Sequence, residues 1–149
     1  YKNRALLYYH IYEELTHALG PEQAEEILKR AIHRRGQERG KEYSQFTPAN
    51  LAGVKEAFLT HLPDEGRLFE PEILTDTSEA LDIKFHRCPL REAWVEAGLP
   101  DELVAKLCRI AAEVDYGLFH EAGFHFYADT WQPGSEGCCC LHIRPGGSS

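Results

Sequence analysis

The sequence predicts an α+β fold: three N-terminal helices, a β-hairpin, two helices and a second β-hairpin, with the two hairpins forming a four-stranded antiparallel sheet. Apolar residues recur at helical spacing in residues 5–62 and 89–120, and they alternate with polar residues between and after these segments. The chain has no internal repeat and no low-complexity block. We therefore expect one domain over residues 1–145, followed by a tail or linker at residues 146–149.

A Gly-Pro pair separates the first two predicted helices. Residues 5–19 carry apolar side chains at helical spacing, Gly20 supplies a C-terminal stop, and Pro21 fits the first position of the next helix. The second helix becomes strongly polar over residues 34–40, which we expect to form a solvated charged face.

Thr47 and Pro48 are typical of the N-cap and first position of a third helix, and its buried stripe would consist of Leu51, Val54, Phe58 and Leu62. The period then changes. After a turn at residues 63–66, residues 69–75 and 80–86 are predicted strands of a hairpin.

Helical spacing returns over residues 89–97, closed by Gly98, and again over residues 100–120. Two further predicted strands, residues 124–130 and 138–144, end the chain and are joined by a bend rich in glycine.

Charge and cysteine content narrow the function classes. The chain has 16 Lys and Arg against 24 Asp and Glu, a formal charge of −8, and no basic stripe, so a nucleic-acid partner is not expected. It shows no run long enough to span a membrane and no secretory signal. The 5 cysteines are an odd number, which makes a poor disulfide framework, so we expect reduced thiols and a cytoplasmic protein.

The most informative position is Cys88, where a predicted strand meets a predicted helix. Pro89 fits the first helical position and places Cys88 at the N-cap, where free N–H groups and the helix dipole favour a thiolate. Arg87 and Arg91 could hold a substrate carboxylate, and His86 lies two residues before the cysteine. The alternative is a buried cysteine that fills a gap at the helix start.

Cys108 and Asp115 are seven residues apart and would lie on nearly the same helix face, beside the apolar stripe. A carboxylate near the core is costly to bury without a partner, which makes Asp115 a catalytic candidate. It could equally be a buried acid that pairs with an arginine, and Cys108 could be a small core residue.

Cys139 falls on the apolar face of the last predicted strand, whereas Cys138, Cys140 and His142 share the opposite face. Those three could converge on zinc, although no C-x-x-C pair supports this and buried cysteines are the simpler interpretation. His125, between two phenylalanines, could face a pocket. Without a zinc motif, phosphate loop or dinucleotide fingerprint, we expect no metal and no other cofactor.

Three motifs, taken in order, resemble the L-2-amino-thiazoline-4-carboxylic acid hydrolase family of bacterial proteins. They are the run from Cys88-Pro89 to Ala93-Trp94, the pair Leu107-Cys108 with Asp115 seven residues on, and Gly134 followed by Cys139. The resemblance covers residues 6–143. The layout is also similar to 4-vinyl-reductase and TRAPP-like ligand-binding domains.

The resemblance implies an enzyme that opens a cyclic amidine bearing a carboxylate at a C–N bond and releases a carbamoyl-cysteine. Its matching positions are Cys88, Cys108, Asp115 and Cys139. We expect Cys88, Asp115 and Cys139 to be catalytic, and the substrate to be bound by Arg87, Arg91, His86, Cys108 and His125.

Two mechanisms fit these residues. In one, a Cys88 thiolate attacks the ring carbon and Asp115 moves the proton; in the other, Asp115 activates water directly while Cys88 polarises the site. A non-catalytic module that binds a small molecule and a zinc-binding structural domain are the alternatives from other classes. The N-terminal helices offer a surface for a homodimer.

Overall fold

A computed structural model describes residues 1–47, 49–62 and 66–146. Pro48, most of the expected turn at residues 63–66 and the end of the expected tail lie outside these residues. The helices are α1 (Lys2–Leu19), α2 (Pro21–Gly40), α3 (Leu51–Thr60), α4 (Pro89–Glu96), α5 (Asp101–Ala111) and α6 (Glu113–Glu121), with a 3₁₀ helix η1 (Lys41–Phe46). The strands are β1 (Pro71–Asp76), β2 (Leu81–Phe85), β3 (His125–Asp129) and β4 (Cys140–Arg144).

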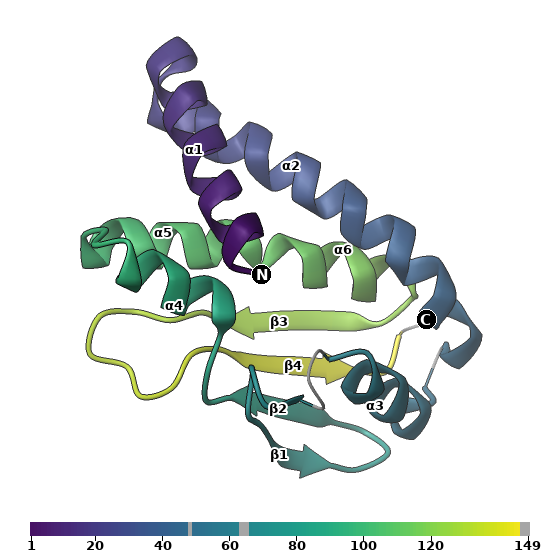
Figure 1. Ribbon diagram of the computed structural model, residues 1–149. Coiled ribbons are helices and arrows are strands. Elements are labelled where there is room, and N and C mark those ends of the chain that lie inside the picture. Colours follow the sequence, from purple (N-terminus) through teal and green to yellow (C-terminus); the bar gives the residue numbers. More distant parts are fainter. Residues whose placement is uncertain (48, 63–65, 147–149) are drawn as a thin grey trace.

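The predicted α+β class is confirmed. The strands form one antiparallel sheet in the order β1-β2-β4-β3, so β2 and β4 join the two predicted hairpins. Figure 1 shows α5 and α6 above this sheet and the α1–α2 pair beyond them. Gly20, with a φ of 91°, separates α1 from α2 as expected, because a left-handed residue ends a helix and glycine adopts that conformation readily.

The polar stretch at residues 34–40 differs from the prediction of a solvated face. It completes α2, and Gly36 and Gly40 are buried in it. A side chain at Gly36 would overlap the backbone carbonyl of Val114, and one at Gly40 would overlap the carbonyl of Leu118. Glycine therefore lets the backbones of α2 and α6 touch, which fixes how α2 lies over the rest of the molecule.

The predicted start of the third helix at Thr47-Pro48 is wrong. Helix α3 begins at Leu51, and its N-cap is Asn50, whose side chain accepts a hydrogen bond from the Gly53 N–H at 3.0 Å. Asparagine satisfies the free N–H groups of a first turn at least as well as threonine.

The single helix predicted over residues 100–120 is two helices. Between α5 and α6, the Asp115 N–H bonds the Ala112 carbonyl three residues back at 3.0 Å, a tighter turn than the α-helical one. Asp115 consequently lies in the first turn of α6.

Two apolar cores meet in the middle of the molecule. One lies between the sheet, α3 and α6, and the other joins α1, α2, α4 and α5. Trp94 is fully buried in the second core, and its indole N–H donates to the Ala5 carbonyl at 2.7 Å, which ties α1 to α4. Cys139 packs against both cores and marks their junction.

Candidate active site

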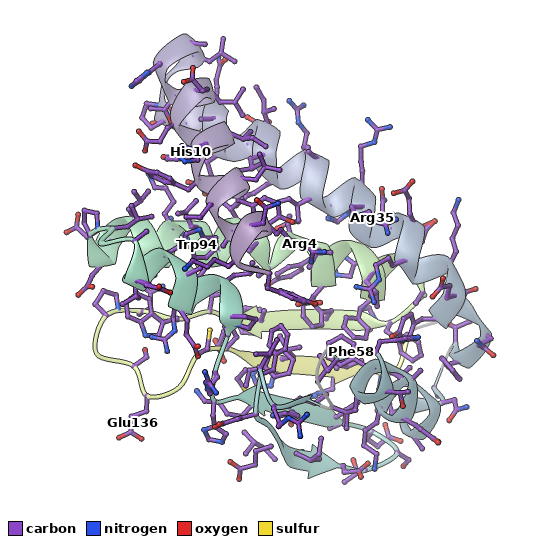
Figure 2. The ribbon with its side chains drawn as sticks, viewed as in Figure 1. Arg4, His10, Arg35, Phe58, Trp94 and Glu136 are labelled. Atoms are coloured by element: carbon purple, nitrogen blue, oxygen red, sulfur yellow. The ribbon has the colours of Figure 1, made fainter. Side chains whose placement is uncertain are left out.

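A cavity of about 500 Å³ lies where the two cores meet. Figure 2 shows four of its lining residues, Arg4, Arg35, Phe58 and Trp94, on α1, α2, α3 and α4 around the space above the sheet. Among the residues that the structure describes, the ionisable side chains on its wall are Arg4, Arg35, Arg39, His61, Asp115, Tyr1, Tyr8, Cys88, Cys108 and Cys139.

Cys88 is the N-cap of α4 with Pro89 at the first helical position, as predicted. Its side chain is half-buried and lines the cavity. The pKa of its thiol is lowered, chiefly by a hydrogen bond with the Cys138 thiol, against the opposing effect of burial. The backbone amides of Arg91 and Leu90 and the positive charge of Arg91 lower it further.

Cys138 holds the other end of that hydrogen bond. It is buried, and its sulfur lies 3.2 Å from the Cys139 sulfur. Hydrogen bonds with Cys108, Cys139 and Cys88, in that order of effect, raise the pKa of Cys138. Its thiol therefore keeps its proton, which it can donate to the Cys88 sulfur when that sulfur is ionised.

The inward position of Cys138 corrects the predicted alternation. The Cys138 N–H donates to the Phe85 carbonyl at 2.9 Å, while the Phe85 N–H donates to the Cys139 carbonyl at 2.8 Å. Two successive residues thus face one residue of β2, an arrangement like a β-bulge, and regular alternation begins only with β4 at Cys140. Cys138 therefore shares the interior with Cys139.

Asp115 lies on the cavity wall in the first turn of α6. Burial raises its pKa to about 7, and the positive charge of Arg39 opposes part of that rise. A carboxyl group in this range exists in both protonation states near neutral pH, so it can give and take a proton during one reaction.

Three arginines line the same cavity, Arg4 from α1 and Arg35 and Arg39 from α2. Arg35 reaches Glu38 at 3.3 Å on the exposed side of α2. Within the described residues, Arg4 and Arg39 form no salt bridge with a carboxylate. The cavity therefore attracts an anion even though the whole chain has a net charge of −8.

His61, at the C-cap of α3, is a further lining residue that the sequence did not single out. Its Nδ1 lies 2.9 Å from the hydroxyl oxygen of Tyr43. Tyr43 is 1% exposed and burial raises its pKa, so its hydroxyl keeps its proton and can donate it to Nδ1. The tyrosine thereby orients the imidazole ring at the cavity.

Four residues expected to bind substrate lie elsewhere. Exposed His86 bonds Glu72 at 2.6 Å, and the guanidinium of Arg87 makes two bonds of 2.8 Å to Glu92. Arg91 packs over the Trp131 ring at 5.4 Å, outside the cavity lining. Exposed His125 lies on β3, in a shallow depression of about 420 Å³ on the other face of the sheet.

The zinc constellation considered for the last strand does not come together. The two imidazole nitrogens of His142 lie 2.6 Å from Asp82 and 3.0 Å from Asp129, on the outer side of β4, while Cys138 is buried in the second core. Among the residues that the structure describes, no cluster of three or more histidine, cysteine or acidic side chains could hold a metal ion.

None of the helices in the described ranges has the length and apolar character needed to cross a membrane.

The fold and the cavity together define a class: an α+β protein with a cavity of small-molecule size, lined by a thiol with a lowered pKa, a carboxyl group that titrates near neutrality, and arginines. The chain belongs to the L-2-amino-thiazoline-4-carboxylic acid hydrolase family, whose model matches residues 1–143. The family name implies hydrolase activity. A comparison with curated proteins found no match.

The structure brings Cys88, Cys108, Asp115 and Cys139 to one cavity, although they come from α4, α5, α6 and the segment before β4. The sequence did not reveal the three arginines. Beside Arg35 and Arg39, the local signal was the pair of glycines at positions 36 and 40, one helical turn apart, which suits close contact with another helix; Arg4 has no such signal.

Proposed function

We propose that this protein hydrolyses a small cyclic amidine or amide that bears a carboxylate, of the 2-amino-thiazoline-4-carboxylate kind, at a ring C–N bond. The observation that carries this proposal is one cavity that holds a thiol with a lowered pKa, an acid with a pKa of about 7, and two arginines, Arg4 and Arg39, that form no salt bridge with any residue the structure describes. The family membership of the chain supports the same reaction class.

The arginines supply the binding energy for the substrate carboxylate. A guanidinium group donates two parallel hydrogen bonds to a carboxylate, and such bonds are strong when water is partly excluded. Arg4 and Arg39 have no competing salt bridge within the described part of the chain. A carboxylate bound there leaves the amidine carbon in the same cavity as the Cys88 thiol and the Asp115 carboxyl group.

The first chemical step is attack by the Cys88 thiolate. A bond forms between its sulfur and the amidine carbon, and the bond from that carbon to the ring nitrogen breaks. The ring nitrogen leaves as an amine, receiving one proton from Asp115 and one from the exocyclic nitrogen. The opened molecule stays attached to Cys88 through a carbon that keeps a double bond to the exocyclic nitrogen.

The second step releases the product. Water adds across the carbon–nitrogen double bond: ionised Asp115 accepts a proton from the water molecule and passes that proton to the nitrogen. The bond from carbon to the Cys88 sulfur then breaks, and the sulfur leaves as a thiolate. The hydroxyl proton returns to Asp115, which leaves a carbamoyl group on the product and restores both side chains. Cys138 acts by donating the hydrogen bond that favours the thiolate, and Cys108 and Cys139 are the other hydrogen-bond partners of Cys138.

The alternative of direct water attack predicts a different pH dependence. Covalent catalysis needs both the Cys88 thiolate and protonated Asp115 in the free enzyme, so kcat/KM rises as the thiol ionises and falls again at higher pH. If ionised Asp115 activates water, kcat/KM rises as Asp115 loses its proton near pH 7 and does not fall again through these two groups. Measuring kcat/KM from pH 5 to 9 therefore separates the two mechanisms.

The test of the function is hydrolysis itself. The full chain is incubated with 2-amino-thiazoline-4-carboxylate, and substrate and carbamoyl product are followed by mass spectrometry. We expect turnover by the unmodified chain and its loss in Asp115→Asn, with Asp129→Asn, on the outer face of the sheet, as the matched control. A chain that binds this compound without converting it, or whose turnover survives Asp115→Asn, contradicts the proposal.

A non-catalytic binding module is the second candidate. The observation that favours it is the aromatic part of the cavity wall, which offers apolar contact without any reactive group. Binding of the same compound by calorimetry without any conversion would support this candidate.

A further inference from the structure

The cavity is larger than a thiazoline carboxylate requires. Its volume of about 500 Å³ falls within the range of sites that enclose drug-sized ligands, whereas a thiazoline carboxylate is one five-membered ring with two small substituents. A ligand of that size held at the arginines leaves much of the cavity wall without a contact.

The remaining wall is aromatic. Phe58 from α3, Phe69 from the segment before β1, and Phe85 from β2 all line the cavity. The ring centroids of Phe69 and Phe85 are 4.9 Å apart, and those of Phe58 and Phe85 are 6.2 Å apart with nearly parallel planes. Phe58 and Phe85 are only 7% and 5% exposed, so their neighbours hold them in place.

The charged and aromatic groups come from different elements. The guanidinium groups belong to α1 and α2, whereas the three phenyl rings belong to α3 and to the β1–β2 edge of the sheet. The two groups adjoin at Tyr1, which also lines the cavity. The Arg4 guanidinium lies over the Tyr1 ring at 4.9 Å, and the Phe69 ring meets that ring edge-on with the centroids 5.7 Å apart. A ligand that satisfies both has an anionic end and an apolar end.

We propose that the substrate of this chain is a carboxylate with an extended apolar arm, and that Phe58, Phe69 and Phe85 form the subsite for that arm. This inference rests on the proposed function, which supplies the reaction: the substrate carries the same scissile C–N bond and, in addition, the apolar arm. The subsite selects larger cyclic amidines or amides over the unsubstituted ring.

Binding of unreactive carboxylates tests the subsite without any turnover. Acetate, butanoate, hexanoate and octanoate are titrated into the unmodified full chain by calorimetry, and alkylammonium ions of equal length serve as the charge control. Burial of each methylene is worth about 0.8 kcal/mol, so we expect the dissociation constant to fall about fourfold per methylene until the arm fills the subsite. The ammonium series is expected to bind far more weakly.

Two variants locate the effect. In Phe69→Ala the gain per methylene should shrink, while in Leu74→Ala, whose side chain is exposed on β1, it should stay as in the unmodified chain. If Phe69→Ala does not fold, NMR contacts between the hexanoate methyl group and the phenylalanine rings decide the same point. A dissociation constant that does not change with arm length, or contacts to other residues only, overturns the proposal.

The subsite proposal and the proposed function can be contradicted separately. Turnover of 2-amino-thiazoline-4-carboxylate together with flat binding of the carboxylate series would leave the hydrolase standing and remove the subsite. Graded binding without turnover of any cyclic amidine would leave the subsite standing and remove the hydrolase.

Discussion

Gly36 of α2 lies directly against the backbone carbonyl of Val114 in α6, with no room for a side chain between them. This contact affects the cavity, because residues next to Gly36 and Val114 line the cavity wall. Arg35 precedes Gly36, Arg39 follows one turn later, and Asp115 follows Val114. Close contact between the two helices therefore sets the position of arginines and acid relative to one another.

Adding a methyl group at this contact should destabilise the protein. In an exposed helix Gly→Ala stabilises by about 1 kcal/mol, but we expect Gly36→Ala to lower the free energy of unfolding by about 1–3 kcal/mol because the helices must separate. Urea denaturation measures the change. Glu38→Ala, at an exposed position of the same helix, should change it by less than about 0.5 kcal/mol. A Gly36→Ala protein as stable as the unmodified chain would show that the contact is not tight.

Arg39 should act on substrate binding more than on the chemical step. Arg39→Gln removes one charged donor for the substrate carboxylate, an interaction of about 1.5–3 kcal/mol, so KM should rise about tenfold to a hundredfold. Measured below pH 7, where Asp115 is mostly protonated with or without the Arg39 charge, kcat should change much less, because the substrate carboxylate takes no part in bond breaking. Arg34→Gln, an exposed neighbour outside the cavity, is the matched control. Equal kinetics in the two variants would exclude Arg39 as the anchor.

Asp115 should make stability depend on pH. Its folded pKa of about 7 lies above the ordinary value of 3.8, so the folded state holds a proton that the unfolded state releases. Stability is therefore unaffected below about pH 4, falls as pH rises toward 7, and stays reduced above it. The full difference is about 4 kcal/mol, from about 1.4 kcal/mol per pKa unit.

Asp115→Asn removes that pH dependence. We expect the free energy of unfolding of the variant to exceed that of the unmodified chain at pH 8 and the two to converge near pH 4, as measured by urea denaturation at each pH. Asp129→Asn, on the outer face of the sheet, is the control for a carboxylate outside the cavity. A constant difference between Asp115→Asn and the unmodified chain across this range would mean that Asp115 is not buried as described.

Cys138 should control the reactivity of Cys88. Cys138→Ala removes the hydrogen bond that contributes most to lowering the pKa of Cys88, so alkylation of Cys88 by iodoacetamide should require a higher pH. Mass spectrometry of the labelled peptides assigns the rate to each cysteine. Cys140 is not among the hydrogen-bond partners of Cys138, so Cys140→Ala should leave the pH dependence of Cys88 alkylation unchanged. Identical labelling profiles in both variants would show that Cys138 does not support the thiolate.

Local chemistry explains which parts of the fold were predictable. Gly20-Pro21 and Cys88-Pro89 define helix boundaries by backbone properties of their own, and the alternation of apolar residues in Leu81–Phe85 reflects the face of β2 that joins the core. Asp82, on the opposite face, is buried as well because His142 and Arg144 bind its carboxylate, which the alternation did not predict. The break at Ala112 and the cap at Asn50 carry no comparable signal, because each competes with neighbours that could form the helix as well.

A site residue could be predicted from the sequence only where a reactive residue type stands at an unusual place in a predicted helix. Cys88 and Asp115 were found because a thiol at an N-cap and an acid beside an apolar stripe are unusual. Arg4 and Arg39 look like ordinary charged helix residues, and only the packing of α1 and α2 over the cavity gives them a role. The inward turn of Cys138 depends on its pairing with Phe85, which lies far away in the sequence.

The most direct test of the central claim is the turnover of Cys88→Ser. With 2-amino-thiazoline-4-carboxylate at saturating concentration, we expect kcat of this variant to fall by about a thousandfold or more, because a serine hydroxyl holds its proton far more strongly than a thiol and does not supply an ionised nucleophile near neutral pH. Cys140→Ser, whose side chain lies outside the cavity lining, should retain the kcat of the unmodified chain. Turnover by Cys88→Ser at the rate of the unmodified chain would contradict the assignment of Cys88 as the nucleophile.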